Sequence, residues 1–122
     1  MTPFQMLNKP ALRDLIGNST GSLTYVDDTP QNPPTPRVTF MYVTAEPNLY
    51  YADPSDQDRE VLQIDVYATS WVETRAILRV IRQLMQYNGI EQAQRFDFER
   101  ETRLSRASID YILFTPTGFR RA

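Results

Sequence analysis

The sequence predicts an α+β fold, in which helices pack on one face of a mostly antiparallel β-sheet of four to five strands, in the order ααβββαββ. Apolar and polar residues alternate along residues 61–68, as in a half-buried strand. Directly after it, residues 71–84 carry apolar side chains at three- and four-residue spacing, which is typical of an amphipathic helix. Two later alternating runs, 95–101 and 107–114, are close enough in sequence to form a hairpin.

Composition indicates one domain over residues 1–122, since a chain of this length with 41% hydrophobic residues can bury a single core. The absence of cysteine and histidine removes thiolate chemistry, disulfides and the commonest general base and metal ligand. We therefore expect no enzyme activity, no catalytic residues, no metal and no cofactor. No run approaches the roughly 20 apolar residues that cross a bilayer, so we expect a soluble, intracellular protein without membrane contact.

Two short helices are predicted at the amino terminus. Thr2 is a suitable cap for the first helix, with Pro3 at its first position and Gln5 completing a capping box. The second should run from Asn8 or Lys9 to Ile16, with Gly17 as its end. Its predicted buried residues are Leu12, Leu15 and Ile16.

The next third of the chain predicts two strands and two loops. Residues 23–26 form a short strand candidate, and four prolines within residues 27–36 predict a loop. Residues 37–44 are apolar on both faces, which favours a central strand. Residues 45–59 form a long inter-strand loop, and loops of that length are usually functional or disordered.

The strand and helix of residues 61–85 should supply much of the core. The strand presents Leu62, Ile64, Val66 and Ala68 on one face. Ser70 or Thr69 can cap the helix, with Glu73 returning the bond, and Gly89 is its expected stop. The predicted apolar helix face consists of Val72, Ala76, Ile77, Val80, Ile81, Leu84 and Met85. We expect Trp71 to anchor the core, and Phe96 and Phe98 to belong to it.

Four segments in the same order resemble the tail terminator proteins of tailed bacteriophages, also called neck terminator or tail-completion proteins. These segments are residues 36–40 (PRVTF), 62–68 (LQIDVYA), 71–84 and 104–111 (LSRASIDY). The resemblance covers roughly residues 33–115, while the amino-terminal thirty residues and the proline-rich stretch match only loosely.

The resemblance implies a structural virion protein at the neck, assembled in the host cytoplasm. Such proteins form a ring, typically hexameric, that ends tail-tube growth and joins the tail to the head. The implied partners are further copies of the chain, the tail tube protein and a head connector or stopper protein, with the sheath protein as a further candidate. DNA would pass through the lumen only in transit. The alternatives are another neck component, such as a head-completion or connector-stopper protein, and a small nucleic-acid-binding module using Phe96 and Phe98.

Charged residues provide candidate contacts between subunits. Arg75, Arg79 and Arg82 share the polar face of the predicted helix, where they are either solvated or meet a neighbouring copy. In the second case their predicted partners are the carboxylates of Asp65, Asp97, Glu99 and Asp110.

The long loop provides candidate contacts with the tail tube or connector. Paired tyrosines beside acidic residues are typical of an interface that orders on binding, although a merely flexible loop is the alternative. The candidate residues are Asn48, Leu49, Tyr50, Tyr51, Asp53, Asp56 and Asp58. The three aspartates could also line a lumen and repel the phosphates of passing DNA.

Overall fold

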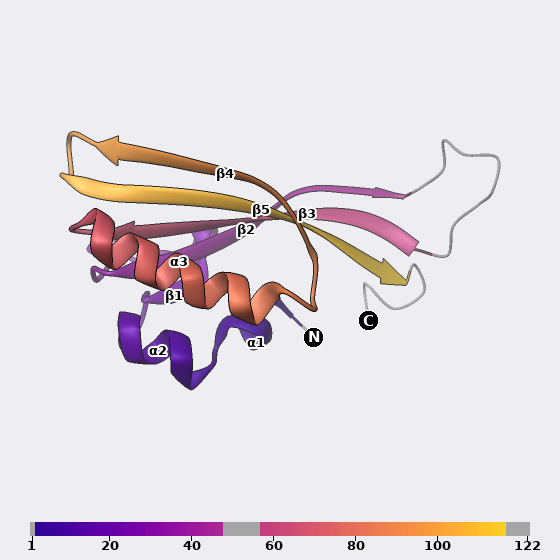
Figure 1. Cartoon of the computed structure of the whole chain (residues 1–122), viewed down its shortest axis with the longest axis horizontal. Coiled ribbons are helices and arrows are strands. Elements are labelled where there is room, and N and C mark those ends of the chain that lie inside the picture. The colour runs from indigo at the N-terminus through magenta and orange to yellow at the C-terminus, as the bar shows by residue number, and fades with distance from the viewer. Residues whose placement is uncertain (1, 48–56, 117–122) are drawn as a thin grey trace.

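The computed structural model describes residues 2–47 and 57–116, and within them the predicted fold is confirmed (Figure 1). The described residues form one five-stranded sheet with strand order β1-β2-β3-β5-β4. Elements follow one another as α1 (Pro3–Leu7), α2 (Pro10–Ile16), β1 (Leu23–Tyr25), the 3-10 turn η1 (Val26–Asp28), β2 (Arg37–Pro47), β3 (Gln57–Ala68), α3 (Trp71–Met85), β4 (Ile90–Glu99) and β5 (Leu104–Pro116).

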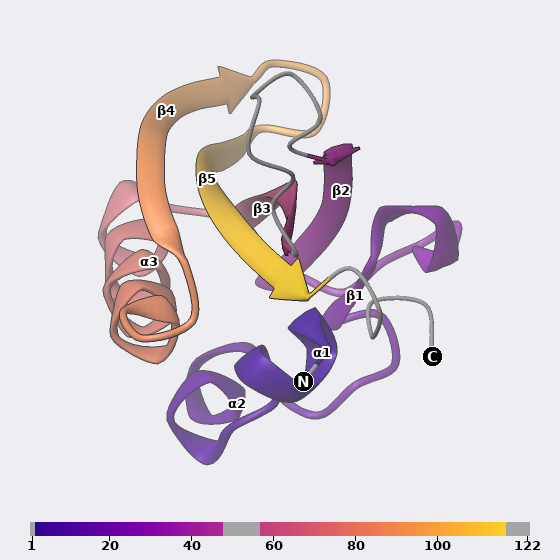
Figure 2. The same cartoon turned by 90° about the vertical axis from the view of Figure 1, so that its right-hand side faces the viewer.

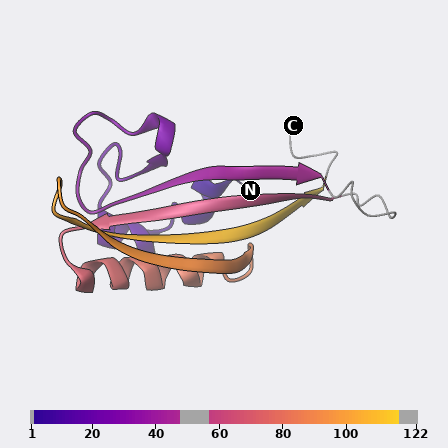
Figure 3. The same cartoon turned by 90° about the horizontal axis from the view of Figure 1, so that it is seen from above.

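Strand pairing is antiparallel along most of the sheet. The pairs β2–β3, β3–β5 and β5–β4 are all antiparallel, and β4–β5 is the predicted hairpin. The exception is β1, which pairs parallel with β2 over residues Leu23–Tyr25 only. Because β1 is so short, β2 beyond Phe40 has no strand paired to that side among the described residues. The far ends of β2, β3 and β5 extend past the helices (Figure 3).

The core lies between one face of the sheet and a layer made by α1, α2 and α3 (Figure 2). On the sheet side of the core, the alternating residues Leu62, Ile64, Val66 and Ala68 of β3 are all fully buried, as predicted. The helices contribute the buried side chains of Leu7, Leu12, Ile16, Ile77, Leu78, Ile81 and Met85. On the opposite face of the sheet no α-helix packs within the described residues, and the 3-10 helix η1 lies beside the β2 side of that face.

Local capping explains where the helices begin. The Thr2 hydroxyl accepts from the Gln5 N–H at 3.1 Å, and the Gln5 side chain accepts from the Thr2 N–H at 2.9 Å, which confirms the predicted box. At α3 the Ser70 hydroxyl accepts from the Glu73 N–H, while the Glu73 carboxylate accepts from the N–H of Thr69. These bonds satisfy N–H groups that the helices cannot pair themselves.

Several apolar residues predicted to be buried are exposed. Val72 is 81% exposed, and Leu15 and Trp71 are also at the surface. Phe96 and Phe98, at 50% and 48% exposed, are not core residues. Their strand, β4, is the outermost of the sheet and all its residues except Glu99 are exposed, so apolar character there does not lead to burial.

The middle strands also differ from expectation. Residues 37–44 are not buried on both faces, because β2 becomes a sheet edge beyond Phe40 and leaves Met41, Tyr42 and Val43 exposed. The predicted loop 45–59 is shorter, since β2 continues to Pro47 and β3 begins at Gln57. The predicted loop 27–36 begins with residues of η1 rather than wholly irregular chain.

Position 89 requires glycine mainly because β5 lies too close to it to admit a side chain, and only secondarily because the helix ends nearby. A Cβ atom at this position would lie 2.6 Å from Leu113 Cδ2 and 3.0 Å from the Ile112 carbonyl oxygen. We expect Gly89→Ala to lower the free energy of unfolding by about 2 kcal/mol, because β5 must shift to admit the methyl group. Gly17→Ala is the comparison for backbone strain alone, since at φ +82° a side chain is strained although nothing lies within 4 Å of an added Cβ. Urea unfolding of both variants measures the difference, and an unchanged Gly89→Ala midpoint would refute the packing argument.

Candidate interaction surface

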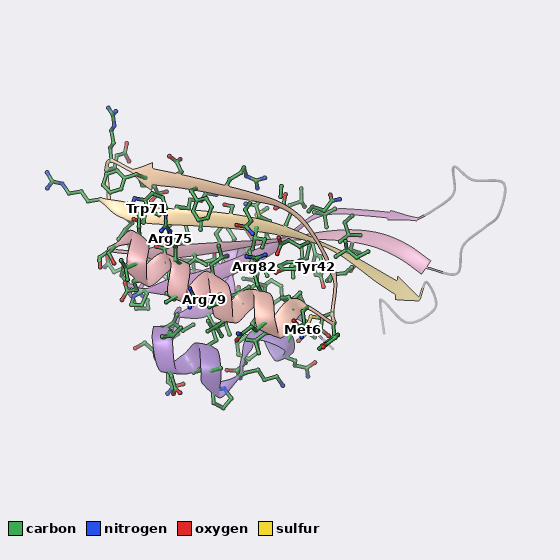
Figure 4. All side chains as sticks on the ribbon, in the orientation of Figure 1. Met6, Tyr42, Trp71, Arg75, Arg79 and Arg82 are labelled. Carbon is green, nitrogen blue, oxygen red and sulfur yellow. The ribbon has the colours of Figure 1, made fainter. Side chains whose placement is uncertain are left out.

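A groove runs between α3 and β4 and brings the predicted arginines together. It consists of three adjoining hollows of about 420, 270 and 260 Å³. Arg79 and Arg82 line both the first and the third hollow, and Arg75 and Phe96 line both the second and the third. Figure 4 shows Trp71, Arg75, Arg79 and Arg82 following one another along α3 beneath β4. The remaining lining residues are Leu78, Gln83, Gln86, Gly89, Glu91, Gln94 and Tyr111.

The three arginines differ in their partners. Arg82 Nε lies 2.8 Å from Glu91 Oε1, so this guanidinium is already paired across the groove. Arg75 and Arg79 are exposed and form no ion pair with any described residue. Two guanidinium groups are therefore available to a carboxylate of another molecule, and arginine binds carboxylates with directed, bidentate geometry.

An aromatic pair closes one end of the groove. The rings of Trp71 and Phe96 lie 5.9 Å apart between centroids at an interplanar angle of 62°, an edge-to-face contact. Trp71 therefore packs on a surface ring rather than in the core, and both rings flank Arg75. Aromatic residues beside arginine are the composition that protein interfaces favour.

The hydroxyl of Tyr111 is buried at the other end of the groove without a hydrogen-bond partner among the described residues. The side chain is 2% exposed, and burial, aided by the charge of Glu91, raises its pKa from 10.0 to about 12, against the opposing effect of Arg82. Ionisation of this residue is thus disfavoured in the folded chain.

The free energy of unfolding should therefore fall as the pH rises above 10. Unfolded tyrosine ionises near its ordinary pKa of 10.0 while folded Tyr111 stays neutral, so stability present below pH 10 is lost as the pH rises toward 12. We expect the free energy of unfolding to decline less steeply in Tyr111→Phe than in the wild type over this interval. Denaturant titrations at pH 9 to 11.5 measure both slopes. Identical slopes would show that Tyr111 does not contribute.

Asp65 has its hydrogen-bonding partners within the subunit. It is 3% exposed, accepts a short hydrogen bond from the Ser108 hydroxyl, and lies 3.4 Å from Arg106 Nη2. The adjacent Tyr67 ring lies between the guanidinium groups of Arg37 and Arg106, at 4.3 and 5.7 Å. Asp65 thus links β3 to β5 on the sheet face opposite the α-helices.

The other predicted acidic partners also have contacts within the subunit. Asp110 Oδ1 lies 3.2 Å from Arg95 Nη2. Asp97 accepts from the N–H of Phe98, and the Glu99 carboxylate accepts from the Thr102 hydroxyl. None of these carboxylates forms an ion pair with Arg75, Arg79 or Arg82 among the described residues, so their pairing between subunits stays a prediction.

Most of the predicted contact loop lies outside the described residues. This applies to Asn48, Leu49, Tyr50, Tyr51, Asp53 and Asp56. Asp58 falls within β3, opposite Pro47 of β2 and Thr115 of β5. The role of the loop in binding the tube or connector stays a prediction.

A second exposed patch was missed in the sequence. At the β1–β2 edge, Val26, Met41 and Tyr42 line a hollow of about 270 Å³ together with Asp27. Asp27 and its neighbour Asp28 are exposed and form no ion pair with any described residue. The paired aspartates beside an apolar strand were the available signal, but the prediction of that strand as central implied that its apolar side chains would be buried.

The described residues contain no group of three or more carboxylates able to hold a metal ion. Within the same part of the chain, no helix combines the length and apolar character needed to cross a membrane.

Comparison with known proteins gives one matching family model and similar chains among the solved structures. The profile of the family described as tail completion protein gp17 matches residues 5–115. A chain of the structure titled "Virion of native gene transfer agent (GTA) particle" has 11% sequence identity and a TM-score of 0.70, with 91% of this chain and 89% of that chain covered. At that identity the similarity shows a shared fold. A search of the curated proteins finds no match.

Proposed function

This chain belongs to the tail completion protein gp17 family, and on that premise we propose that it forms a ring at the head-proximal end of a tail. Membership makes it a structural virion protein of the tail. In the proposed role, six copies close a ring on the finished tail tube, stop tube growth and present a surface to the head connector or stopper protein. DNA passes through the ring without being retained.

The observation that carries this proposal is the family match over residues 5–115, which includes all the described strands and helices except Pro116 of β5 and Pro3 and Phe4 of α1. The similar chain in the gene transfer agent virion supports a particle role through its fold. The surface of the chain also suits assembly, because Arg75 and Arg79 lie exposed beside two aromatic rings. The chemistry of these groups fits binding to other proteins.

The exposed rings of Phe96 and Phe98 do not lead us to propose nucleic-acid binding. Stacking on a base needs a free ring face and a cationic surface that follows the phosphates. Phe96 is already engaged by Trp71, and the net charge of the chain is −2. The charge distribution therefore favours a protein partner.

Removing the chain from particle-producing cells tests the proposed role. We expect unjoined heads together with tails of irregular length, and restoration of joined particles when the wild-type chain is supplied in trans. Electron micrographs of lysates measure the joined fraction and the distribution of tail lengths. Joined particles with tails of normal length in the absence of the chain would refute the role.

A further inference from the structure

From the structure we infer that copies of this chain associate head to tail, through two different surfaces at opposite edges of the sheet. The basic groove is the surface formed by Trp71, Arg75, Arg79 and Phe96, between α3 and β4. The acidic edge is the surface formed by Val26, Asp27, Asp28, Met41 and Tyr42, at the β1–β2 edge. The basic groove of one copy binds the acidic edge of the next. This inference deepens the proposed ring and rests on it.

The two surfaces have complementary charge. Arg75 and Arg79 in the basic groove, and Asp27 and Asp28 at the acidic edge, form no ion pairs within the described part of the subunit. Two unpaired cations on one surface thus match two unpaired anions on the other. Such an arrangement favours the correct contact and disfavours groove against groove, where like charges would meet.

Both surfaces also expose apolar side chains beside their charges. Trp71 and Phe96 are exposed in the basic groove, and Val26, Met41 and Tyr42 are exposed at the acidic edge. At the acidic edge the exposure arises because no further strand pairs with β2 past Phe40 among the described residues, and in the basic groove because β4 is the last strand of the described sheet. Burying these side chains against each other would remove apolar surface from water at both edges.

The placement of the surfaces determines the symmetry. β4 ends the strand order at one side of the sheet and β1–β2 ends it at the other, and Figure 2 shows α3 and β4 on the side away from β1. A contact between two unlike surfaces leaves one of each free on every pair of copies. Such heterologous contacts add further copies and close into a ring when the rotation per copy permits.

Cysteine cross-linking tests the contact, because the chain contains no cysteine. Val72→Cys lies beside Trp71 and is highly exposed, and Val26→Cys lies at the acidic edge. We expect a short bis-maleimide to join the two single variants when they are mixed, and to give covalent dimers. A mixture of Val72→Cys with Lys9→Cys, an exposed position outside both surfaces, is the matched control. Equal cross-linking in the two mixtures would overturn the inference.

Charge reversal tests the same contact through assembly. We expect Arg75→Glu/Arg79→Glu and Asp27→Lys/Asp28→Lys each to raise the concentration needed for assembly at least tenfold, as measured by light scattering during size-exclusion chromatography. Combining all four substitutions should restore assembly, because the charges are exchanged rather than lost. Arg100→Glu/Arg103→Glu changes the net charge equally at the exposed β4–β5 turn and should assemble normally. Circular dichroism confirms that each variant is folded.

The outcomes separate this inference from the proposed function. Wild-type rings that tolerate both reversals, or a wild-type chain that stays monomeric at every concentration reached, overturn the head-to-tail contact. Normal particles in cells lacking the chain count against the proposed function instead, and leave a cross-linked contact standing.

Discussion

Asp65→Ala should lower the free energy of unfolding by about 3 kcal/mol, because the substitution leaves the buried Ser108 hydroxyl and the partly buried Arg106 guanidinium without the carboxylate that they bind. Asp65 is 3% exposed and accepts hydrogen bonds from Ser108 and Arg106. Without Asp65, the buried Arg106 Nε still lacks a hydrogen-bond partner among the described residues, and the guanidinium keeps only the Tyr67 ring, 5.7 Å away, and the attraction of Glu99. Denaturant unfolding monitored by circular dichroism gives the value.

The matched control is Asp110→Ala, which removes the other ion pair between a strand carboxylate and an arginine on this face. Arg95, its partner, has a side chain that is 53% exposed, so water replaces the lost interaction. We expect a loss of about 0.5 kcal/mol for this variant. Equal losses in the two variants would show that burial of Asp65 contributes nothing.

Ile81→Ala should lower the free energy of unfolding by about 3 to 4 kcal/mol, as expected for truncation of a fully buried side chain. Ile81 is fully buried and belongs to the core between α3 and the sheet, so its removal leaves a cavity. Val72→Ala, in the same helix but facing solvent, should change the value by less than about 0.5 kcal/mol. Similar losses at both positions, measured by urea unfolding, would contradict the helix orientation.

The sequence predicted best where local pattern and tertiary position agree. Leu62, Ile64, Val66 and Ala68 alternate with polar residues and are buried as a set. Ser70 and Glu73 make α3 begin where their spacing indicated, and the arginines of α3 are exposed as their periodicity required. In these cases, the period of the sequence contains the information that determines the face.

Prediction failed where burial depends on the position of a strand within the sheet. Phe96, Phe98 and Met41 have the character of core residues, yet they stay exposed because they lie on strands at the two sides of the described sheet. Alternation identifies a strand but not its neighbours, and the three-residue length of β1 decides how much of β2 is exposed. For the same reason, the exposure of the acidic edge could not be predicted from the sequence.

The arginines of the candidate site could be predicted from the sequence, but their contacts could not. Helical spacing was enough to place Arg75, Arg79 and Arg82 together on one surface. Their proposed carboxylate partners could not be assessed in the same way, because pairing across the sheet brings Asp65 to Ser108 and Asp110 to Arg95. Contacts between residues distant in sequence follow from strand register, which short patterns do not specify.

The most direct test of the account is to locate the chain on completed tails. A histidine tag ahead of Thr2, which is exposed, can be marked with nickel–gold and viewed by electron microscopy of purified tails. The account predicts gold at one end of each tail, the end that joins the head, and ring-shaped density there in averaged images. Gold distributed along the tail, or found at its opposite end, would contradict the proposal that this chain forms the ring that completes the tail.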